Sequence, residues 1–438
     1  MISKNPNTQK KIVNRALLGT PETKPGSLLS TVKVALKKRS DILVLANKHQ
    51  TPFYIFDQKE AERSINEFKQ AFEKYLPKSE IYYAVKTNDH DLLLREVVKG
   101  GLGFDVSSGR ELKLALKYGA NKIVFSGPAK SDLELKLAIA HRDKTIIHLD
   151  SFEELKRLDR LINNQQVTVG VRISTSHHGA WNKFGIPLNR LANFWREAKR
   201  YPNIKLSGLQ CHISFNKSVR PYQDMIKEIS EYLRHNFKKE ELAEISFFDF
   251  GGGFSPSLLE AEYPWITYQG RIIQAASEYY NLKPSFKHKY YPVRSITPDK
   301  FALGITNACK KYLKPLIKCV YMCEPGRIIA ERSMHIALRL LDLKDNKFGI
   351  ADGATNLIGV WEKYEDYYSP VINLTHPSLK ERKFTLYGNL CTPYDIWGYY
   401  CYADKIVQGD VMLIPFQGAY TYALASDFIK PIAPTYKI

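Results

Sequence analysis

Residues 81–127 read IYYAVKTNDHDLLLREVVKGGLGFDVSSGRELKLALKYGANKIVFSG. This stretch contains three short, largely apolar runs, IYYAV, GLGFDV and KIVFSG, and each gap between them is long enough for a helix. Short buried strands that alternate with helices are typical of βα units, whose strands lie parallel. The stretch therefore predicts an α/β protein with a parallel sheet.

The same alternation extends in both directions, from about residue 52 to about residue 325. Further strands are expected in PFYIF, TIIHLD, VTVGVRI, SGLQCHIS, ISFFDFG and IKCVYMCEP. Residues 58–76 predict a helix, because apolar side chains recur there every three or four positions, at Ala61, Ile65, Phe68 and Phe72. About eight such units predict a (β/α)8 barrel, in which reactive groups follow the carboxyl ends of the strands.

The pattern changes beyond about residue 334 to strands without long helices, in HIALRLLDLK, KFGIADG, RKFTLYG and DVMLIPF. These runs predict a second domain with an antiparallel sheet. We expect four parts along the chain: a disordered basic leader at 1–29, a segment at 30–56 that joins the β domain, the barrel at 57–333, and the β-rich domain at 334–438. The aromatic, basic stretch from Pro284 to Pro298 predicts a loop inserted near the end of the barrel.

Composition disfavours a nucleic-acid-binding, membrane-spanning, disulfide-rich or metal-binding protein. The chain has 438 residues, with 64 Lys and Arg against 45 Asp and Glu, but the basic residues are scattered, which favours a solvated surface over nucleic-acid binding. No apolar run is long enough to span a membrane. The six cysteines include no CxxC pair, so neither a disulfide framework nor a metal site is expected. We expect a cytoplasmic protein with a small-molecule partner.

The motif YYAVKTN places Lys86 at the end of a predicted strand, just before a helix expected from about Asp89. Packing explains a lysine poorly at this position. An amine held against a cationic or apolar wall would have a lowered pKa and would suit formation of an imine. The alternative is an ordinary exposed lysine at a strand end.

A glycine triplet follows another predicted strand, in DFGGGF. Gly251, Gly252 and Gly253 would allow backbone N–H groups to converge on an anion such as a phosphate. Barrel enzymes often bind phosphate after their last strands, where this triplet falls. Alone, the triplet could equally be a tight turn.

The motif CEPGR follows the last predicted barrel strand and carries one acid and one base. Glu324 can hydrogen-bond a pyridinium nitrogen and keep it protonated, while Arg327 can hold a phosphate. Alternatively, the two side chains pair with each other.

Taken together, these motifs resemble the fold-type III pyridoxal 5'-phosphate (PLP) decarboxylases, which include ornithine, lysine, arginine and diaminopimelate decarboxylases. The resemblance covers about residues 30–430 and rests on these segments, in order: TPFYIFD, YYAVKTN, GLGFDVSSGREL, VFSGPAK, HLDSFEEL, VGVRI, GLQCHIS, DFGGGF, CEPGR, ADGATNL, GNLCTPYD and GAYTYA. It implies an alanine racemase-like barrel, PLP as cofactor, and an amino acid decarboxylase that is a homodimer with shared active sites.

The resemblance also implies a role for each matching residue. Lys86 would hold PLP as a Schiff base, His212 would stack on its ring, and Glu324 would pair with its nitrogen. Asp105 would lie near Lys86. The remaining cofactor contacts would come from Arg172, Ser214, Gly251, Gly252, Gly253, Gly326, Arg327 and Tyr420. Without the surrounding motifs, His212 would be read as a core histidine and Tyr420 as a packed aromatic residue.

In this family the C-terminal domain supplies the other wall of the site. Cys391 would reach the active site of the partner subunit and protonate the carbanion, although a free cysteine is often only a small buried hydrophobic residue. Substrate contacts would come from Asp352, Thr392, Asp395 and Tyr420. The alternative for Asp352 is an ordinary turn aspartate.

Several positions depart from the family pattern. Thr392 stands where ornithine and diaminopimelate decarboxylases carry an acid, and Gly359 stands where diaminopimelate enzymes tend to place an arginine. In CHISF, Ser214 is displaced by one position and Phe215 takes the place of a phosphate-binding serine. These departures indicate a divergent branch that acts on a diamino acid, of either L or D configuration, or on a carboxylated intermediate of siderophore or other secondary metabolism.

Three other functions remain open at this point. A racemase is disfavoured because Glu324 strengthens the cofactor as an electron sink, whereas racemases on this barrel use an arginine there. A non-enzymatic regulator that has lost PLP is disfavoured because Lys86, Glu324, Arg327 and Cys391 are all present. Nucleic-acid binding through the basic leader would depend steeply on salt.

Overall fold

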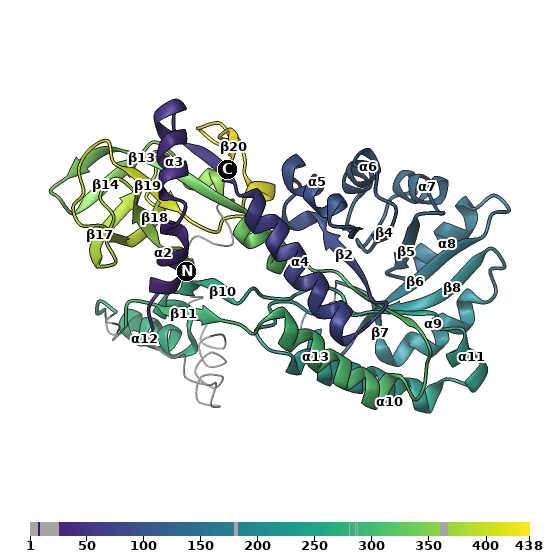
Figure 1. Ribbon diagram of the computed structural model, residues 1–438. Coiled ribbons are helices and arrows are strands. Elements are labelled where there is room, and N and C mark those ends of the chain that lie inside the picture. Colours follow the sequence, from purple (N-terminus) through teal and green to yellow (C-terminus); the bar gives the residue numbers. More distant parts are fainter. Residues whose placement is uncertain are drawn as a thin grey trace.

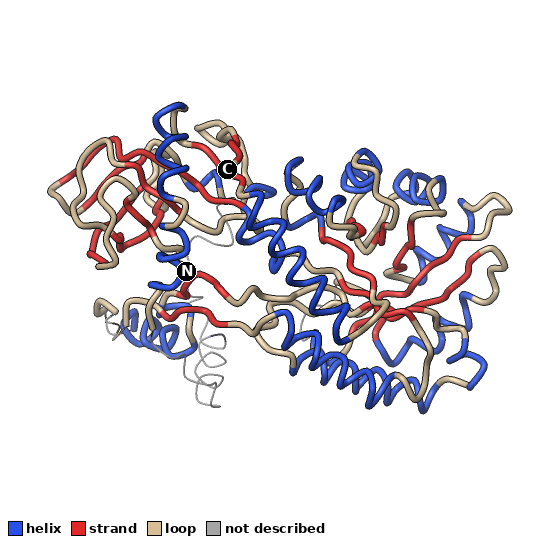
Figure 2. The backbone as a smooth tube through the Cα atoms, viewed as in Figure 1, coloured by secondary structure: helices blue, strands red, loops and turns tan. Residues whose placement is uncertain are grey.

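The computed structural model describes residue 8 and residues 26–178, 183–279, 281–284, 286, 288–359 and 367–438. These residues form a parallel barrel, a mostly antiparallel sheet beside it, and a small third sheet (Figures 1 and 2). The expected leader at 1–29 lies largely outside the described residues. Among the described helices, none combines the length and the apolar character needed to cross a membrane.

Eight parallel strands close the barrel, in the order β2-β3-β4-β5-β6-β8-β9-β12, and β12 pairs with β2 to complete the ring. The prediction of a (β/α)8 barrel is confirmed. The strands are β2 (Glu80–Ala84), β3 (Gly103–Val106), β4 (Ile123–Phe125), β5 (Thr145–Leu149), β6 (Val167–Ser174), β8 (Ile204–Gln210), β9 (Phe247–Asp249) and β12 (Val320–Cys323). The short β7 (Ile186–Pro187) pairs in parallel with the end of β6.

Helices surround the barrel (Figure 1). They are α4 (Gln58–Tyr75), α5 (Asp91–Lys99), α6 (Gly109–Lys117), α7 (Asp132–Ala140), α8 (Phe152–Leu161), α9 (Leu191–Ala198), α10 (Arg220–Asn236), α11 (Lys239–Ala243), α13 (Pro298–Ala308) and α14 (Arg327–Ala330). Side-chain caps define where several of them begin: Ser108, Ser131 and Ser151 each accept a hydrogen bond from the backbone three residues on. The apolar face predicted for residues 58–76 is buried in α4.

The second domain is built on an eight-stranded sheet in the order β14-β17-β18-β16-β19-β13-β1-β20. Its strands are β1 (Phe53–Phe56), β13 (Met334–Lys344), β14 (Phe348–Ala351), β16 (Val371–Asn373), β17 (Glu381–Tyr387), β18 (Ile396–Tyr402), β19 (Val411–Ile414) and β20 (Thr435–Lys437). Most pairings are antiparallel, but β1 with β20, β14 with β17 and β16 with β18 are parallel. Helices α2 (Leu29–Leu36) and α3 (Arg39–Lys48) share a hydrophobic cluster with this sheet.

The expected loop at 284–298 is part of a larger folded insertion. Between β9 and α13 the chain forms β10 (Leu258–Glu262), α12 (Tyr268–Tyr279) and β11 (Tyr291–Arg294), and β10 also pairs with β15 (Tyr367–Tyr368). The insertion lies against the second domain, where the Tyr290 hydroxyl is 3.1 Å from a carboxylate oxygen of Glu381. The sequence analysis did not predict this sheet, because its strands pair across long separations.

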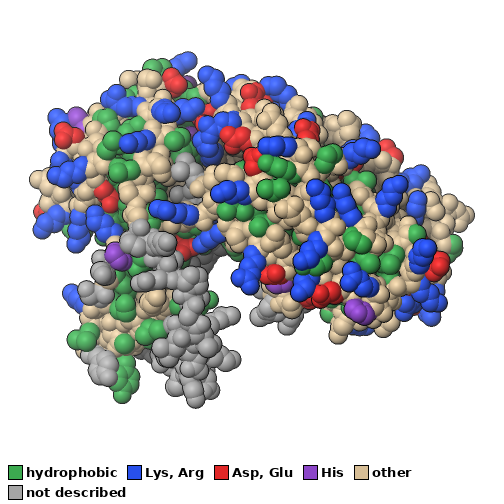
Figure 3. Space-filling model, turned by 60° about the horizontal axis from the view of Figure 1, so that its bottom comes forward, with side chains coloured by type: hydrophobic (Ala, Val, Ile, Leu, Met, Phe, Trp, Pro, Cys, Tyr) green, Lys and Arg blue, Asp and Glu red, His purple; other side chains and the backbone are tan. Residues whose placement is uncertain are grey.

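Lys and Arg side chains are spread over the face of the molecule shown in Figure 3 and do not gather into one stripe. This view agrees with the scattered basic residues of the sequence.

Candidate active site

A cavity of about 800 Å³ opens at the carboxyl ends of the barrel strands. It brings together residues that the sequence analysis drew from separate motifs. The predicted residues in its lining are Lys86, Arg172, His212, Ser214, Gly253, Glu324, Gly326, Arg327 and Tyr420.

Lys86 lies on a single 3-10 turn, Val85–Thr87, directly after β2. Its side chain is 35% exposed, and its Nζ is 3.6 Å from Oδ2 of the fully buried Asp105. Burial opposes the charge of the amine, but the negative charge of Asp105, with Tyr420 and Glu324, outweighs it and raises the pKa of Lys86. The expectation of a lowered pKa is therefore wrong for the free amine, since the wall beside it is acidic.

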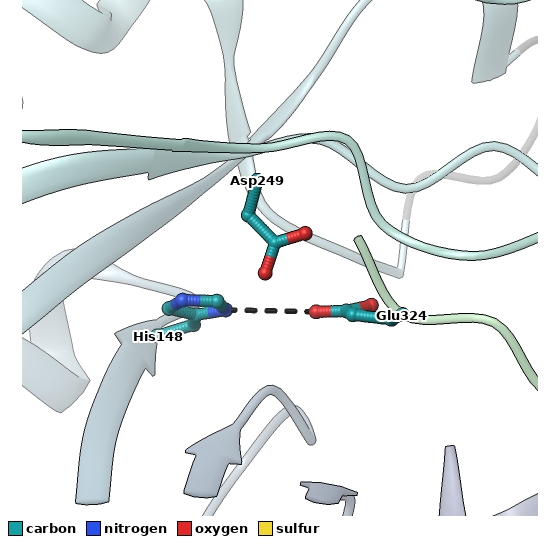
Figure 4. Close-up of side chains that lie close together, drawn as sticks. All are labelled: His148, Asp249 and Glu324. Carbon is teal, nitrogen blue, oxygen red and sulfur yellow. Dashed lines mark ion pairs between the residues drawn. The ribbon is translucent and has the colours of Figure 1, made fainter. Parts of the chain in front are cut away.

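Glu324 follows β12 and is 1% exposed. Both of its carboxylate oxygens accept a hydrogen bond from Gln210 Nε2, at 3.2 and 3.3 Å. His148 Nδ1 lies 3.9 Å from Oε1 of the same carboxylate (Figure 4). The acid is thus held rigidly at the floor of the cavity, where it can face a ring nitrogen.

His212 is neutral, and its proton can be assigned. Nδ1 lies 3.0 Å from the Gly252 nitrogen and 3.4 Å from Glu324 Oε2, and Nε2 is 3.2 Å from Ser214 Oγ. Because the Gly252 N–H can only donate, its shorter bond to Nδ1 assigns the ring proton to Nε2. Burial, together with the positive charges of Lys86 and Arg172, holds the pKa of His212 well below its usual value. A neutral ring fixed in this way can present a flat face to the cavity.

The glycine triplet adopts a backbone that side chains would not permit. Gly251 and Gly253 have φ of +66° and +85°, and a Cβ on Gly253 would lie 1.9 Å from the Ile213 carbonyl oxygen. Two of the three N–H groups already have partners, because Gly251 donates to Asp249 Oδ1 at 2.8 Å and Gly252 donates to His212. Gly253 is the member of the triplet that lines the cavity, and phosphate binding by the triplet stays a prediction.

Arg327 does not pair with Glu324, the alternative considered from the sequence. Its Nη2 lies 2.5 and 2.7 Å from the two carboxylate oxygens of Glu260 and 3.0 Å from Glu331 Oε1. These contacts raise the pKa of Arg327 well above its usual value against the opposing effect of burial. The guanidinium reaches the cavity, but its charge is already offset by two acids, one of which comes from the inserted strand β10.

Arg172 and Tyr420 complete the cavity wall. Arg172, on β6, donates to the Ser126 carbonyl oxygen at 3.1 Å, and its guanidinium lies 4.4 Å from the centre of the Phe184 ring. Tyr420 has a φ of +55°, which is unusual for a residue with a side chain, and its N–H donates to the Thr87 carbonyl oxygen at 2.9 Å. This bond ties the C-terminal segment to the turn that carries Lys86.

Apart from Tyr420, the predicted residues of the second domain do not line this cavity within one chain. Cys391 is exposed, which excludes its alternative as a buried hydrophobic residue. Asp395 is buried and accepts hydrogen bonds from the Thr355 N–H and hydroxyl, both at 2.9 Å, and from the Leu390 N–H at 2.7 Å. Asp395 thus fixes the loop that carries Cys391 and Thr392, and its predicted contact with substrate is not supported.

The carboxylate of Asp352 is likewise bound by groups of its own chain. It accepts hydrogen bonds from the Thr51 hydroxyl and, at 2.8 Å, from the Arg339 N–H. It lines a second cavity, of about 850 Å³, formed by the second domain. These contacts do not support the predicted substrate role.

Motif analysis did not single out four residues that shape the site. Gln210 could have been inferred, because it precedes Cys211 and His212 on a strand whose alternate side chains point into the barrel. His148 and Asp249 lie inside the recognised motifs HLDSFEEL and DFGGGF. No sequence motif pointed to Glu260, because it lies on β10 of the insertion.

The residues of the cavity fit PLP. The cofactor requires an accessible amine for its aldehyde, an acid for its ring nitrogen and room for its phosphate. Lys86, after β2, is the amine, and Glu324, after the neighbouring strand β12, is the acid. Gly253 and Gly326 line the cavity without side chains, so a phosphate can approach their backbone closely.

Comparisons with known proteins agree with this site. The family model described as the pyridoxal binding domain of pyridoxal-dependent decarboxylase matches residues 62–297. Diaminopimelate decarboxylase from Vibrio cholerae is 25% identical over 406 residues, which cover 88% of this chain and 86% of that protein. A 2-[(L-alanin-3-ylcarbamoyl)methyl]-2-hydroxybutanedioate decarboxylase from Staphylococcus aureus is 24% identical over 417 residues, covering 89% of this chain and 94% of the relative.

Among solved structures, diaminopimelate decarboxylase from Helicobacter pylori, complexed with L-lysine, superposes with a TM-score of 0.73 at 23% identity, covering 91% of this chain and 94% of that one. The enzyme from M. jannaschii, in complex with L-lysine, gives a TM-score of 0.74 at 22% identity, covering 90% and 89%. These likenesses support the fold. With the family match over more than half of its length, they show that this chain belongs to the pyridoxal-dependent decarboxylases, enzymes that use PLP as cofactor.

Proposed function

We propose that this enzyme decarboxylates an amino acid that carries a second charged group at its far end. That group is the amine of a diamino acid, such as ornithine, lysine or their D isomers, or the carboxylate of an intermediate of siderophore or other secondary metabolism. The named activities of the relatives support both classes, since one acts on diaminopimelate and another on an alaninyl hydroxybutanedioate.

The observation that carries the preference for a distal carboxylate is the charge of the cavity lining. Lys86, Arg172, Lys183 and Arg327 contribute four basic groups to the lining, whereas Glu324 contributes one acid. Lys86 is paired with Asp105, and Arg327 is paired with Glu260 and Glu331. Lys183 is an exposed cation within the lining, and it can attract a substrate carboxylate.

The residues of the site have distinct roles in this proposal. Lys86 would hold the cofactor covalently, and Asp105 would keep its amine in place. Glu324 would face the ring nitrogen, and the neutral ring of His212 would support one face of the cofactor. When bound, PLP supplies the electron sink that accepts the electron pair left by departing CO2. Gly253 and Gly326 would give its phosphate room.

The choice of decarboxylation over racemisation rests on Glu324. A buried carboxylate that faces the ring nitrogen would keep it protonated, which strengthens the electron sink that decarboxylation needs. A product that retains its carboxylate and differs only in configuration would contradict this choice.

We also propose that the enzyme is a homodimer in which Cys391 donates the proton that replaces CO2 in the partner's site. Its exposure, on a loop held rigid by Asp395 and away from the cavity of its own chain, supports this arrangement. A mixture of Lys86→Ala and Cys391→Ala proteins should regain activity that neither variant has alone, because mixed dimers contain one intact site. Activity that stays absent in the mixture, with dimers present by sedimentation, would contradict shared sites.

The proposed function is tested by measuring CO2 release from a panel of substrates. The panel should include L- and D-ornithine, L- and D-lysine, diaminopimelate, and amides of diaminopropionate that carry distal carboxylates. We expect the highest kcat/KM for a carboxylated substrate, no activity for Lys86→Ala, and a loss of preference for the carboxylate in Lys183→Met. The control variant, Lys199→Met, replaces an exposed lysine outside the cavity lining. Equal kcat/KM for wild type and Lys183→Met on carboxylated substrates would contradict the distal carboxylate. The cytoplasmic location and the lack of nucleic-acid binding stay predictions.

A further inference from the structure

Three buried polar side chains from three different barrel strands meet beneath the cavity. They are Glu324, after β12; Asp249, at the end of β9; and His148, on β5 (Figure 4). Their exposures are 1%, 0% and 0%, and the polar atoms concerned all lie within 4.8 Å of one another. Such a cluster in the interior of a barrel must balance its charge locally, because water is excluded.

The hydrogen bonds leave one oxygen of the cluster, and both ring nitrogens of His148, without a partner among the described residues. Asp249 Oδ1 accepts from the Gly251 N–H at 2.8 Å, but Asp249 Oδ2 has no hydrogen-bond partner among the described residues. Glu324, beside it, is bonded by Gln210 Nε2. Two buried carboxylates this close repel each other strongly, so they do not both carry a charge at neutral pH.

The hydrogen bonds favour the proton on Asp249, because both oxygens of Glu324 accept a hydrogen bond from Gln210, whereas Asp249 Oδ2 accepts none from the described residues. Burial and the negative charge of Glu324 raise the pKa of Asp249 well above its usual value, while the Gly251 N–H opposes this only in part. Other ionisable or charged groups also act on the cluster. His212 lies nearest, with its Nδ1 3.4 Å from Glu324 Oε2, and the rest are Tyr82 on β2, Asp105 on β3, Arg172 on β6, Cys323 on β12, and Lys130 and Lys86 after β4 and β2.

His148 adds no positive charge to the cluster. Burial, with the nearby charges of Lys130 and Arg172, lowers the pKa of His148 to about 3, so its ring is neutral. The ring is fixed from both sides, because it stacks on Phe247 and a Cβ on Gly170 would lie 2.9 Å from its Cδ2. It therefore flanks Glu324 as a neutral wall.

We propose that Asp249 is a positioning residue that stays protonated and donates its Oδ2 proton to Glu324, which fixes Glu324 as the carboxylate facing the cofactor nitrogen. The hydrogen bond gives the unpartnered oxygen a partner and leaves a single negative charge in the cluster. The location of the Asp249 proton does not depend on which substrate the enzyme uses. The effect of that proton on the cofactor does rest on the proposed function, because it acts through Glu324.

The proton is tested in the apoenzyme by infrared spectroscopy, which separates the C=O stretch of a carboxylic acid from the bands of a carboxylate. The difference between wild type and Asp249→Asn should show the loss of one acid band that shifts in D2O. Loss of carboxylate bands instead would overturn the proposal, whatever the substrate of the enzyme proves to be. A divalent metal bound to the purified protein in a 1:1 ratio would also overturn it, because a metal ligand must be ionised.

The effect on Glu324 is tested by a double-mutant cycle in the reconstituted enzyme. Asp249→Leu removes the donor at similar volume and should weaken PLP binding about ten- to a hundredfold, the range for one hydrogen bond to a charged group. In the Glu324→Gln background the same substitution should have little effect. Equal losses in both backgrounds would mean that Asp249 does not act through Glu324. Circular dichroism must show that each variant is folded. If Asp249→Leu does not fold, the infrared comparison of wild type with Asp249→Asn still tests the proposal.

Discussion

Asp395→Asn tests whether the structure has correctly reassigned a residue that the sequence placed at the substrate. The amide oxygen of Asn can keep the two bonds from Thr355, but its NH2 group would then face the Leu390 N–H, which lies 2.7 Å from Oδ2. The variant loses one hydrogen bond to a charged group and leaves a buried N–H unpaired. Each effect costs about 1 to 3 kcal/mol. Part of this loss is recovered, because burial penalises the charge of Asp395 and so raises its pKa, and the neutral Asn carries no such penalty.

We therefore expect Asp395→Asn to lower the free energy of unfolding by about 2 to 4 kcal/mol. Urea denaturation followed by circular dichroism measures this change. Asp404→Asn is the matched control in the same domain; its partner is Arg382 at 4.0 Å and its side chain is 78% exposed, so it should change stability by less than about 0.5 kcal/mol. If Asp395→Asn keeps the stability of the wild type and raises KM instead, Asp395 contacts the substrate and the reassignment is refuted.

Two further predictions concern buried acids. Burial raises the pKa of Glu111 from 4.5 to about 7, so between these pH values the folded protein holds a proton that the unfolded chain releases. The contribution of protonated Glu111 to the unfolding free energy is therefore complete below pH 4.5 and is lost as the pH rises through 7. The unfolding free energy of wild type relative to Glu111→Gln should thus fall by about 3 kcal/mol over that range in urea titrations, and a constant difference would contradict it. Glu260→Gln removes one of the two negative charges that offset Arg327, so PLP should bind the apoenzyme about tenfold more tightly. A spectroscopic titration measures this affinity, and the control Glu262→Gln, on the same strand, should not change it. Unchanged or weaker binding by Glu260→Gln would contradict the idea that Glu260 limits Arg327 as a phosphate ligand.

Much of the barrel and its site could be predicted because both depend on local pattern. Each barrel strand is a short apolar run, and a reactive residue placed just after such a run must lie at one end of the barrel. Lys86, Glu324 and Tyr420 come from distant parts of the chain, yet the motifs alone were enough to expect them in one cavity, and the structure brings them together.

The partners of those residues could not be predicted in this way. Arg327 meets Glu260 because the insertion folds as a sheet, and the sheet depends on pairing between β10 and β15, which are about a hundred residues apart. The raised pKa of Lys86 follows from the nearness of Asp105, a distance that no spacing in the sequence encodes. The same holds for Asp395, whose motif resembles a substrate contact but whose oxygens are used by Thr355 and Leu390.

The sequence by itself determined the barrel, the family and the residue types of the site, because strand periodicity and motif order are properties of neighbouring residues. Only the tertiary structure decided which charges are neutralised, which protons are held and which carboxylates are structural. These outcomes depend on burial and on contacts between side chains from different strands, and electrostatic interactions of that kind change steeply over a few ångströms.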